Sequence, residues 1–304
     1  MNPTRALLSL CPSLSSITKP PILTPFTRRL FQLPPPPPQP SPSHSDLPSF
    51  LTYATRTNLP ESTTHYQGTL YEYSIQSHLR SCAFALHRVG GRSDLGIDLT
   101  GTWHVGSNPA LDAPVRVVVQ CKALKTKIGP NVVRELEGVT AASKRRGGGG
   151  CAGVLVSPRE ATKGVREALG RSGMPLVWMM VERGGRVRQV LWNGRVEGLG
   201  LAGLGVEVLY PLGSGSDGDQ DGDGHGKGVV SLTWEGREVQ TMDEVEEEMG
   251  RLEEEWMAKW EEKGLRDVSR EEVLDAVERV VPGTRPIMIS EDEREMVVRS
   301  LLAA

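Results

Sequence analysis

VRVVVQCK, residues 115–122, is the stretch of sequence that decides the fold of this chain. Its uninterrupted apolar run, Val117–Val119, is typical of a central strand that is buried on both faces of a sheet. Because side chains alternate along a strand, Gln120 and Lys122 are expected on one face and Cys121 on the other. The stretch therefore predicts a buried strand whose last residues carry polar groups.

The segments on either side alternate between helix and strand patterns. We expect helices at 67–80, 131–146 and 161–171, and strands at 82–89, 97–104, 152–156 and 176–181. The order α-β-β-β-α-β-α-β predicts an α/β fold, in which helices flank a mixed sheet. Further strands are expected at 186–192, 206–210 and 229–234, and helices at 242–263, 271–280 and 291–302, with Ser269 and Ser290 as N-caps.

Charge is distributed unevenly along the chain. Residues 65–200 carry nineteen Lys and Arg against ten Asp and Glu, whereas residues 201–304 carry eleven against twenty-six. A basic middle suits a phosphate backbone, because neutralising phosphates releases counterions. The acidic last third cannot contribute to that binding. It could solvate the protein or shield the basic surface.

Several classes of protein are excluded by composition. No apolar run is long enough to cross a bilayer, so we expect no membrane span. The four cysteines show no CxxC pairing and no zinc-ligand spacing, which favours reduced thiols. The acidic stretch 217–228 begins like an EF-hand loop, but its twelfth position is Gly228, where that loop needs Glu.

The N-terminal segment resembles a mitochondrial presequence. Its first acidic residue is Asp46, and four Lys and Arg precede it among Ser, Thr and Leu. Residues 28–31, Arg-Arg-Leu-Phe, resemble a processing site. We expect a mitochondrial protein of the matrix, although the composition also fits a disordered tail. The five-proline run 34–38 predicts a stiff linker.

Three segments could combine into a site for phosphodiester hydrolysis, which needs a carboxylate-held metal and a cation near the phosphate. Pairing of strands 97–104 and 115–121 would place Asp98 beside Gln120. The side chains of Asp98 and Gln120 and the carbonyl of Cys121 would then offer oxygen ligands to Mg²⁺ or Mn²⁺. Lys122 would stabilise the reacting phosphate, and Glu72 could supply a second negative charge.

Each of these residues also has an ordinary structural explanation. Asp98 could cap a turn, Lys122 could be a solvated charge at a strand end, and Glu72 could lie on a helix surface. Contacts with phosphates are expected from a basic set that could equally be solvated: Lys125, Lys127, Lys144, Arg145 and Arg146.

Three ordered segments carry a resemblance to a known family: GGRSDLGIDL at 90–99, VQCK at 119–122 and VVRELEGV at 132–139. Together they resemble the Mrr-like branch of the PD-(D/E)xK nucleases, in which Gln commonly replaces the acid of the (D/E)xK element. The helix that carries Gly68 and Glu72 is similar to the first core helix of that branch. With its acid-free N-terminus, the chain also resembles the fungal mitochondrial family required for respiratory growth.

The resemblance implies a restriction-endonuclease-like fold with catalytic Asp98, Gln120, Lys122 and Glu72. The expected division of the chain is a targeting segment and Pro-rich linker at 1–45, a linker at 46–63, a nuclease domain at 64–181, a β extension at 182–236 with a disordered acidic loop at 213–228, and an acidic helical region at 237–304.

The favoured hypothesis is a metal-dependent endonuclease or repair nuclease that acts on mitochondrial DNA and supports respiratory growth. A nuclease-fold protein that binds DNA with little or no turnover is the alternative, favoured by the amide at Gln120. A structural assembly factor is a third possibility. The apolar stripe of helix 242–263 could pair with a second copy or a partner helix, although packing onto its own domain is preferred.

Overall fold

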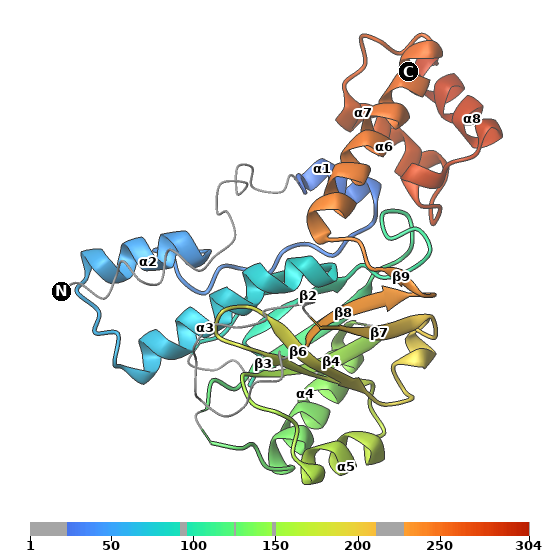
Figure 1. Cartoon of the computed structure of the whole chain (residues 1–304). Helices are drawn as coiled ribbons and strands as arrows, with labels where there is room; N and C mark the ends of the chain where they lie inside the picture. The colour runs from blue at the N-terminus through green and yellow to red at the C-terminus, as the bar shows by residue number, and fades with distance from the viewer. Residues whose placement is uncertain (1–22, 92–95, 125, 148–149, 211–227, 304) are drawn as a thin grey trace. The chain divides into compact units, whose positions relative to one another are not determined.

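The computed structural model describes residues 23–91, 96–124, 126–147, 150–210 and 228–303 (Figure 1). Several predicted features fall outside these residues: the first 22 positions of the targeting segment, Asp94, Lys125 and nearly all of the acidic loop 213–228. The chain divides into two compact units. One is Pro36–Met242, and the other joins the N-terminal residues up to Pro35 to Asp243–Ala304.

The unit Pro36–Met242 is built on a six-stranded mixed sheet, as the sequence predicts. Its strands lie in the order β1 to β6: β1 (Phe84–Arg88), β2 (Leu99–Trp103), β3 (Val115–Cys121), β4 (Cys151–Ser157), β5 (Leu176–Val181) and β6 (Val187–Trp192). The three pairs β1–β2, β2–β3 and β5–β6 are antiparallel, whereas β3–β4 and β4–β5 are parallel. Strand β6 therefore belongs to the main sheet, not to the β extension where the sequence analysis placed it.

Helices and a second sheet cover the two faces of this sheet. On one face, α3 (Thr64–His78) and the small sheet β7 (Leu204–Leu209), β8 (Val229–Trp234), β9 (Arg237–Glu238) share a core with the strands. On the other face, α4 (Asn131–Gly147) and α5 (Lys163–Arg171) pack on β4 and β5 (Figure 1). Burial on both faces explains why β3 and β4 consist of continuous apolar residues.

Strand β3 lies inside the sheet, where it is paired on both sides. Its antiparallel partner β2 aligns Leu99 with Val119, and its parallel partner β4 aligns Gln120 with Leu155. The odd-numbered residues Val117 and Val119 join the core on the α3 face. Alternation therefore directs Gln120 to the α4 face. The predicted strand and the two-sided burial of its apolar run are confirmed.

Folded structure starts well before residue 64, where the sequence analysis expected it to begin. Helix α2 (Leu47–Arg56) lies in the segment taken for a linker, and Asp46 caps its first turn with a capping box to Ser49. Phe50 of this helix is fully buried against Tyr66 and Tyr73, and the imidazole of His44 lies 2.7 Å from the Tyr73 hydroxyl. Aromatic burial, which composition does not reveal, orders this segment.

The second unit is a helical module, by which we mean residues 24–35 together with residues 243–304. It contains α1 (Pro25–Leu30), α6 (Met242–Glu262), α7 (Arg270–Val280), η5 (Pro286–Met288) and α8 (Glu291–Leu302). Ser269 and Ser290 cap α7 and α8 with capping boxes, as predicted. Helix α1 was not predicted, since it lies in the segment read as a presequence and linker.

The apolar stripe of α6 is buried within the chain itself. Val245, Met249, Trp256 and Trp260 are each at most 2% exposed. This burial supports packing within the chain and leaves no exposed stripe on the described residues of α6 for a second copy. Within the described residues, no helix combines the length and the apolar character that a membrane crossing requires.

Candidate active site

Asp98 lies directly before β2 and is held in place by backbone hydrogen bonds. Its N–H donates to the carbonyl of Val119 on β3 at 3.0 Å, and its carbonyl accepts from the N–H groups of Val89 and Gly90 at 2.9 Å each. These bonds tie Asp98 to the ends of both neighbouring strands. The expected meeting of Asp98 with the end of β3 is therefore found in the structure.

The Asp98 carboxylate points to the strand end that carries the other candidates. Its Oδ2 accepts a 2.6 Å hydrogen bond from the N–H of Cys121, the residue between Gln120 and Lys122. A carboxylate bonded to a backbone N–H forms a charge-assisted bond, which is stronger than a neutral one. The bond fixes the carboxylate next to the backbone that presents the Gln120 and Lys122 side chains.

Gln120 is a buried amide at the end of β3. Its side chain is 4% exposed, and among the described residues its Oε1 has no hydrogen-bond partner. Gly96, with φ +81°, approaches the amide so closely that a Cβ there would lie 3.1 Å from Gln120 Nε2. A buried acceptor without a partner costs free energy. Gln120 therefore offers an oxygen that a ligand could use.

Glu72 of α3 reaches the same region from the other face of the sheet. Both Glu72 and Asp98 border Gly90: a Cβ built there would lie 3.2 Å from Glu72 Oε2 and 3.4 Å from Asp98 Cα. Glu72 Oε2 accepts a 2.6 Å hydrogen bond from Nε of Arg88, the last residue of β1. Both side chains of this ion pair are mostly buried, at 14% and 11% exposed.

Arg88 was missed by the sequence analysis. It is a charged residue at the end of the otherwise apolar or aromatic strand Phe84–Arg88, directly before the Gly90-Gly91 turn. Its guanidinium also lies 5.4 Å from the centre of the Tyr73 ring. A charged residue at the end of a buried strand is a sequence signal that could have identified Arg88 as a candidate site residue. Its partner Glu72 on α3 can be identified only from the fold.

Lys122 follows β3 and lies near α4. Its Nζ is 3.8 Å from Oε2 of Glu135. Glu135 is half exposed, at 53%, and Lys122 is 28% exposed. A 3.8 Å contact with an exposed carboxylate is a weak ion pair. Lys122 is thus placed at the strand end, where Glu135 holds its ammonium group only loosely.

The Cys121 thiol is surrounded by these charges. Burial raises the pKa of Cys121 well above its ordinary value, and the carboxylates of Asp98 and Glu72 raise it further. Lys122 and Arg88 act on the Cys121 pKa in the opposite direction. These four charged groups thus act on the pKa of one thiol, in keeping with the contacts described above.

The predicted phosphate-binding residues that the structure describes belong to two parts of the chain. Lys127 is exposed in the loop after β3, and Lys144 and Arg145 are exposed near the end of α4. Arg146 lies in the last turn of the same helix. Lys125 falls outside the described residues. Phosphate binding by this basic set therefore stays a prediction.

The residues at the strand end fit a hard divalent cation through oxygen atoms rather than through a cluster of acids. Among the described residues, no group of three or more His, Cys, Asp and Glu side chains is arranged to hold a metal ion. The donors would be the carboxylates of Asp98 and Glu72, the Gln120 amide oxygen and the Cys121 carbonyl. The unpartnered Gln120 Oε1 is the structural feature that favours such an ion.

These features define the chain as an α/β protein with two carboxylates, an amide and a lysine gathered at the end of a central strand. Residues 63–113 and 108–210 match the model of the family described as "Required for respiratory growth protein 7". The matched region contains α3, the six-stranded sheet and every residue of the candidate site.

Curated relatives agree with this match. A Schizosaccharomyces pombe protein, "Uncharacterized protein C824.03c, mitochondrial", is 43% identical over 96 residues, which are 32% of this chain and 38% of that protein. "Required for respiratory growth protein 7, mitochondrial" of Saccharomyces cerevisiae is 25% identical over 177 residues, 44% of this chain and 72% of that protein. The chain thus spans little more than a third of the fission-yeast relative.

A third relative, the protein of the same name in Vanderwaltozyma polyspora, is 25% identical over 164 residues, 40% of this chain and 65% of that protein. These relatives are all named mitochondrial, which confirms the predicted mitochondrial localisation. The resemblance to the respiratory-growth family is confirmed as a match to its family model, whereas the Mrr-like nuclease resemblance stays a prediction. No solved structure matches the chain.

Proposed function

We propose that the chain is a divalent-metal-dependent DNA endonuclease of the mitochondrial matrix that supports respiratory growth by maintaining mitochondrial DNA. The observation that carries the proposal is Gln120 Oε1, a buried oxygen without a described partner, at the strand end that binds the Asp98 carboxylate and precedes Lys122. A purely structural strand end would not be expected to leave such an acceptor unsatisfied.

Asp98, Gln120 and the carbonyl of Cys121 are the ligands proposed for Mg²⁺ or Mn²⁺, with Glu72 as a further carboxylate. When bound, the ion would supply Lewis-acid polarisation of the phosphate. The hydrogen bond from the Cys121 N–H orients the Asp98 carboxylate before any ligand arrives. This preorganisation reduces the cost of assembling the site.

Lys122 has the role of a phosphate-binding cation in this proposal. Hydrolysis adds a water oxygen to phosphorus while the bond to one sugar oxygen breaks, and negative charge accumulates on the phosphate oxygens. The Lys122 ammonium group would stabilise that charge after leaving its weak contact with Glu135. DNA would approach over the basic residues that follow the strand, of which Lys127 is exposed.

The Glu72–Arg88 ion pair favours a second candidate function. Because Arg88 neutralises Glu72, and Gln120 carries no charge, Asp98 remains the main source of negative charge for a cation. A weaker cation site would suit a nuclease-fold protein that binds DNA with little or no turnover. This candidate shares the same fold and basic surface but predicts no cleavage.

Cleavage of supercoiled, linear and branched DNA by the full chain separates the two functions. The assay would compare Mg²⁺, Mn²⁺ and EDTA, with Lys122→Ala as the site variant and Lys163→Ala as a control on an exposed lysine of α5. Metal-dependent cleavage that is lost only in Lys122→Ala would support the endonuclease. Salt-sensitive binding without cleavage would favour the binding protein, and neither activity would favour an assembly factor.

A further inference from the structure

Residues 24–33, which the sequence analysis assigned to the targeting segment, are built into the helical module. Phe26, Leu30, Phe31 and Leu33 are all buried, and Leu30 and Phe31 are fully so. Thr24 caps α1 by accepting a hydrogen bond from the Thr27 N–H at 3.1 Å. A cleavable leader needs no such packing, since it is removed from the protein that functions.

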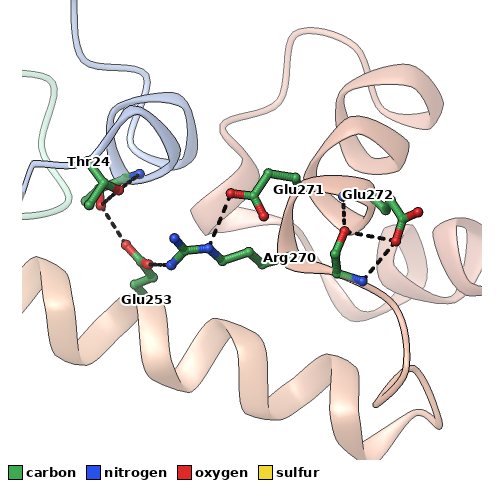
Figure 2. A network of polar contacts seen from close by, with 7 residues as sticks. Thr24, Glu253, Arg270, Glu271 and Glu272 are labelled. Atoms are coloured by element: carbon green, nitrogen blue, oxygen red, sulfur yellow. Dashed lines mark hydrogen bonds and ion pairs between the residues drawn. The ribbon is translucent and has the colours of Figure 1, made fainter.

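Polar contacts join this segment to α6. The Thr27 hydroxyl donates to Glu253 Oε2 at 2.8 Å, and Glu253 also accepts from Arg270 at 3.1 Å, a network shown in Figure 2. The Arg270 guanidinium lies 4.8 Å from the centre of the Phe26 ring. The ring of Phe26 meets that of Trp256 edge-on at 5.9 Å. Thr27 and Phe26 therefore help to position the side chains between α6 and α7.

A second set of contacts joins the segment to α7 and to the loop that follows it. Arg29 forms ion pairs with Asp275 at 2.5 Å and Glu278 at 2.7 Å. The Arg285 guanidinium donates to the carbonyl of Phe31 at 2.8 Å. Arg29, one of the two arginines that make residues 28–31 resemble a processing site, is thus paired with two acidic residues of α7.

We propose that presequence removal takes place before Thr24, and that residues 24–33 stay in the mature protein as a structural part of the helical module. Cleavage within residues 28–31 would remove Phe26 and Thr27 and would leave Trp256 and Glu253 without these partners. The basic residues of the leader that direct import would then be Arg5 and Lys19, whereas Arg28 and Arg29 serve the fold.

The first test is the N-terminus of the mature protein. The full chain with a C-terminal tag would be expressed in yeast, purified from mitochondria and analysed by intact-mass and N-terminal peptide mass spectrometry. We expect a shortened chain whose N-terminus lies at or before Thr24. An uncleaved chain, or a mature chain that starts anywhere after Thr24, would overturn the proposal, whether or not the protein cleaves DNA.

The second test measures what the segment does for the module by comparing Leu30→Ala with Leu302→Ala in the full chain. The two variants lose the same atoms from the same module, but Leu30 is fully buried and Leu302 is 72% exposed. We expect amide exchange in α6 and α7 to accelerate by about tenfold or more in Leu30→Ala, with little change in Leu302→Ala. Equal exchange in the two variants would show that the segment is not part of the module and would overturn the proposal.

Discussion

The Asp98 carboxylate and the backbone N–H of Cys121 form a 2.6 Å hydrogen bond that joins the start of β2 to the end of β3. The two residues are 23 positions apart in the sequence. The bond gives Asp98 two functions at once, because it stabilises the strand end and orients the carboxylate toward the proposed cation site.

Replacing Asp98 is expected to separate these two functions. Asp98→Asn keeps an acceptor for the Cys121 N–H but removes the charge, whereas Asp98→Ala leaves that part-buried N–H without its partner. We expect both variants to lose metal-dependent DNA cleavage, and Asp98→Ala to be less stable than Asp98→Asn by about 1–3 kcal/mol. Cleavage assays and urea unfolding check the two effects. Retained cleavage in both variants would exclude Asp98 as a ligand.

Alanine is ordinarily tolerated at a strand start, so the loss of stability expected for Asp98→Ala comes from the lost hydrogen bond. The hydrogen bond to Cys121 makes the side chain part of the strand end itself.

Gln120→Glu is expected to strengthen the proposed cation site. It adds a carboxylate where the structure has a buried amide oxygen without a described partner. We expect a lower melting temperature in EDTA, because a buried carboxylate is costly, and a larger rise on addition of Mg²⁺ than in the unmodified chain. Gln67→Glu, at a residue of α3 that is not fully buried, is the control. A melting temperature that is indifferent to Mg²⁺ would argue against a cation at Gln120.

The Glu72–Arg88 ion pair is expected to be important for stability. Removing one partner of a mostly buried pair leaves an uncompensated charge, so Arg88→Met should lower the free energy of unfolding by about 3 kcal/mol. The double variant Glu72→Gln with Arg88→Met should recover much of that loss. A double-mutant cycle by urea unfolding measures the coupling, and a coupling near zero would mean that the pair has no structural role.

The basic residues near the end of α4 are expected to contribute to DNA binding. Replacing Lys144, Arg145 and Arg146 together by Ala should weaken binding and flatten its dependence on salt, since fewer counterions are released. The control replaces the exposed basic residues of the neighbouring helix α5: Lys163, Arg166 and Arg171. An equal effect of the two triple variants, measured by fluorescence anisotropy over a salt series, would mean that binding is not localised to α4.

Alkaline pH is expected to destabilise the fold through its buried thiols. Burial raises the pKa of Cys82 from 9.0 to about 11. The unfolded thiol therefore ionises at a lower pH than the folded one, and the free energy of unfolding should fall as pH rises from 9 toward 11. Urea unfolding across this range should show a shallower fall in Cys82→Ala than in the unmodified chain. Parallel slopes would exclude a contribution from Cys82.

The main sheet was largely predictable because its signals are local. The apolar runs of β3, β4 and β5, and their alternation with helix patterns, predicted the mixed sheet and the order of its elements. The N-terminal helices were missed because residues 1–63 as a whole are rich in proline, serine and threonine. Pro25 and Pro48 lie in the first turns of α1 and α2, where proline is compatible with a helix.

The candidate site was predictable in part. Alternation along β3 places Gln120 and Lys122 on one face without any knowledge of the fold. The pairing of Glu72 with Arg88 and the contact of Lys122 with Glu135 depend on how α3 and α4 pack against the sheet. The place of β6 was not predictable for the same reason. Its sequence predicts a strand, but only the fold shows that this strand joins the main sheet.

By itself, the sequence determined the strand that ends in Gln120, Cys121 and Lys122, the helices around it and the mitochondrial character of the first residues. Periodicity and capping act over a few neighbouring residues, so they can be read from the sequence directly. Only the tertiary structure decided that Arg29 pairs with Asp275, 246 positions away. Such contacts depend on burial that the whole fold creates, and they give residues 24–33 a structural role where composition indicated only a leader.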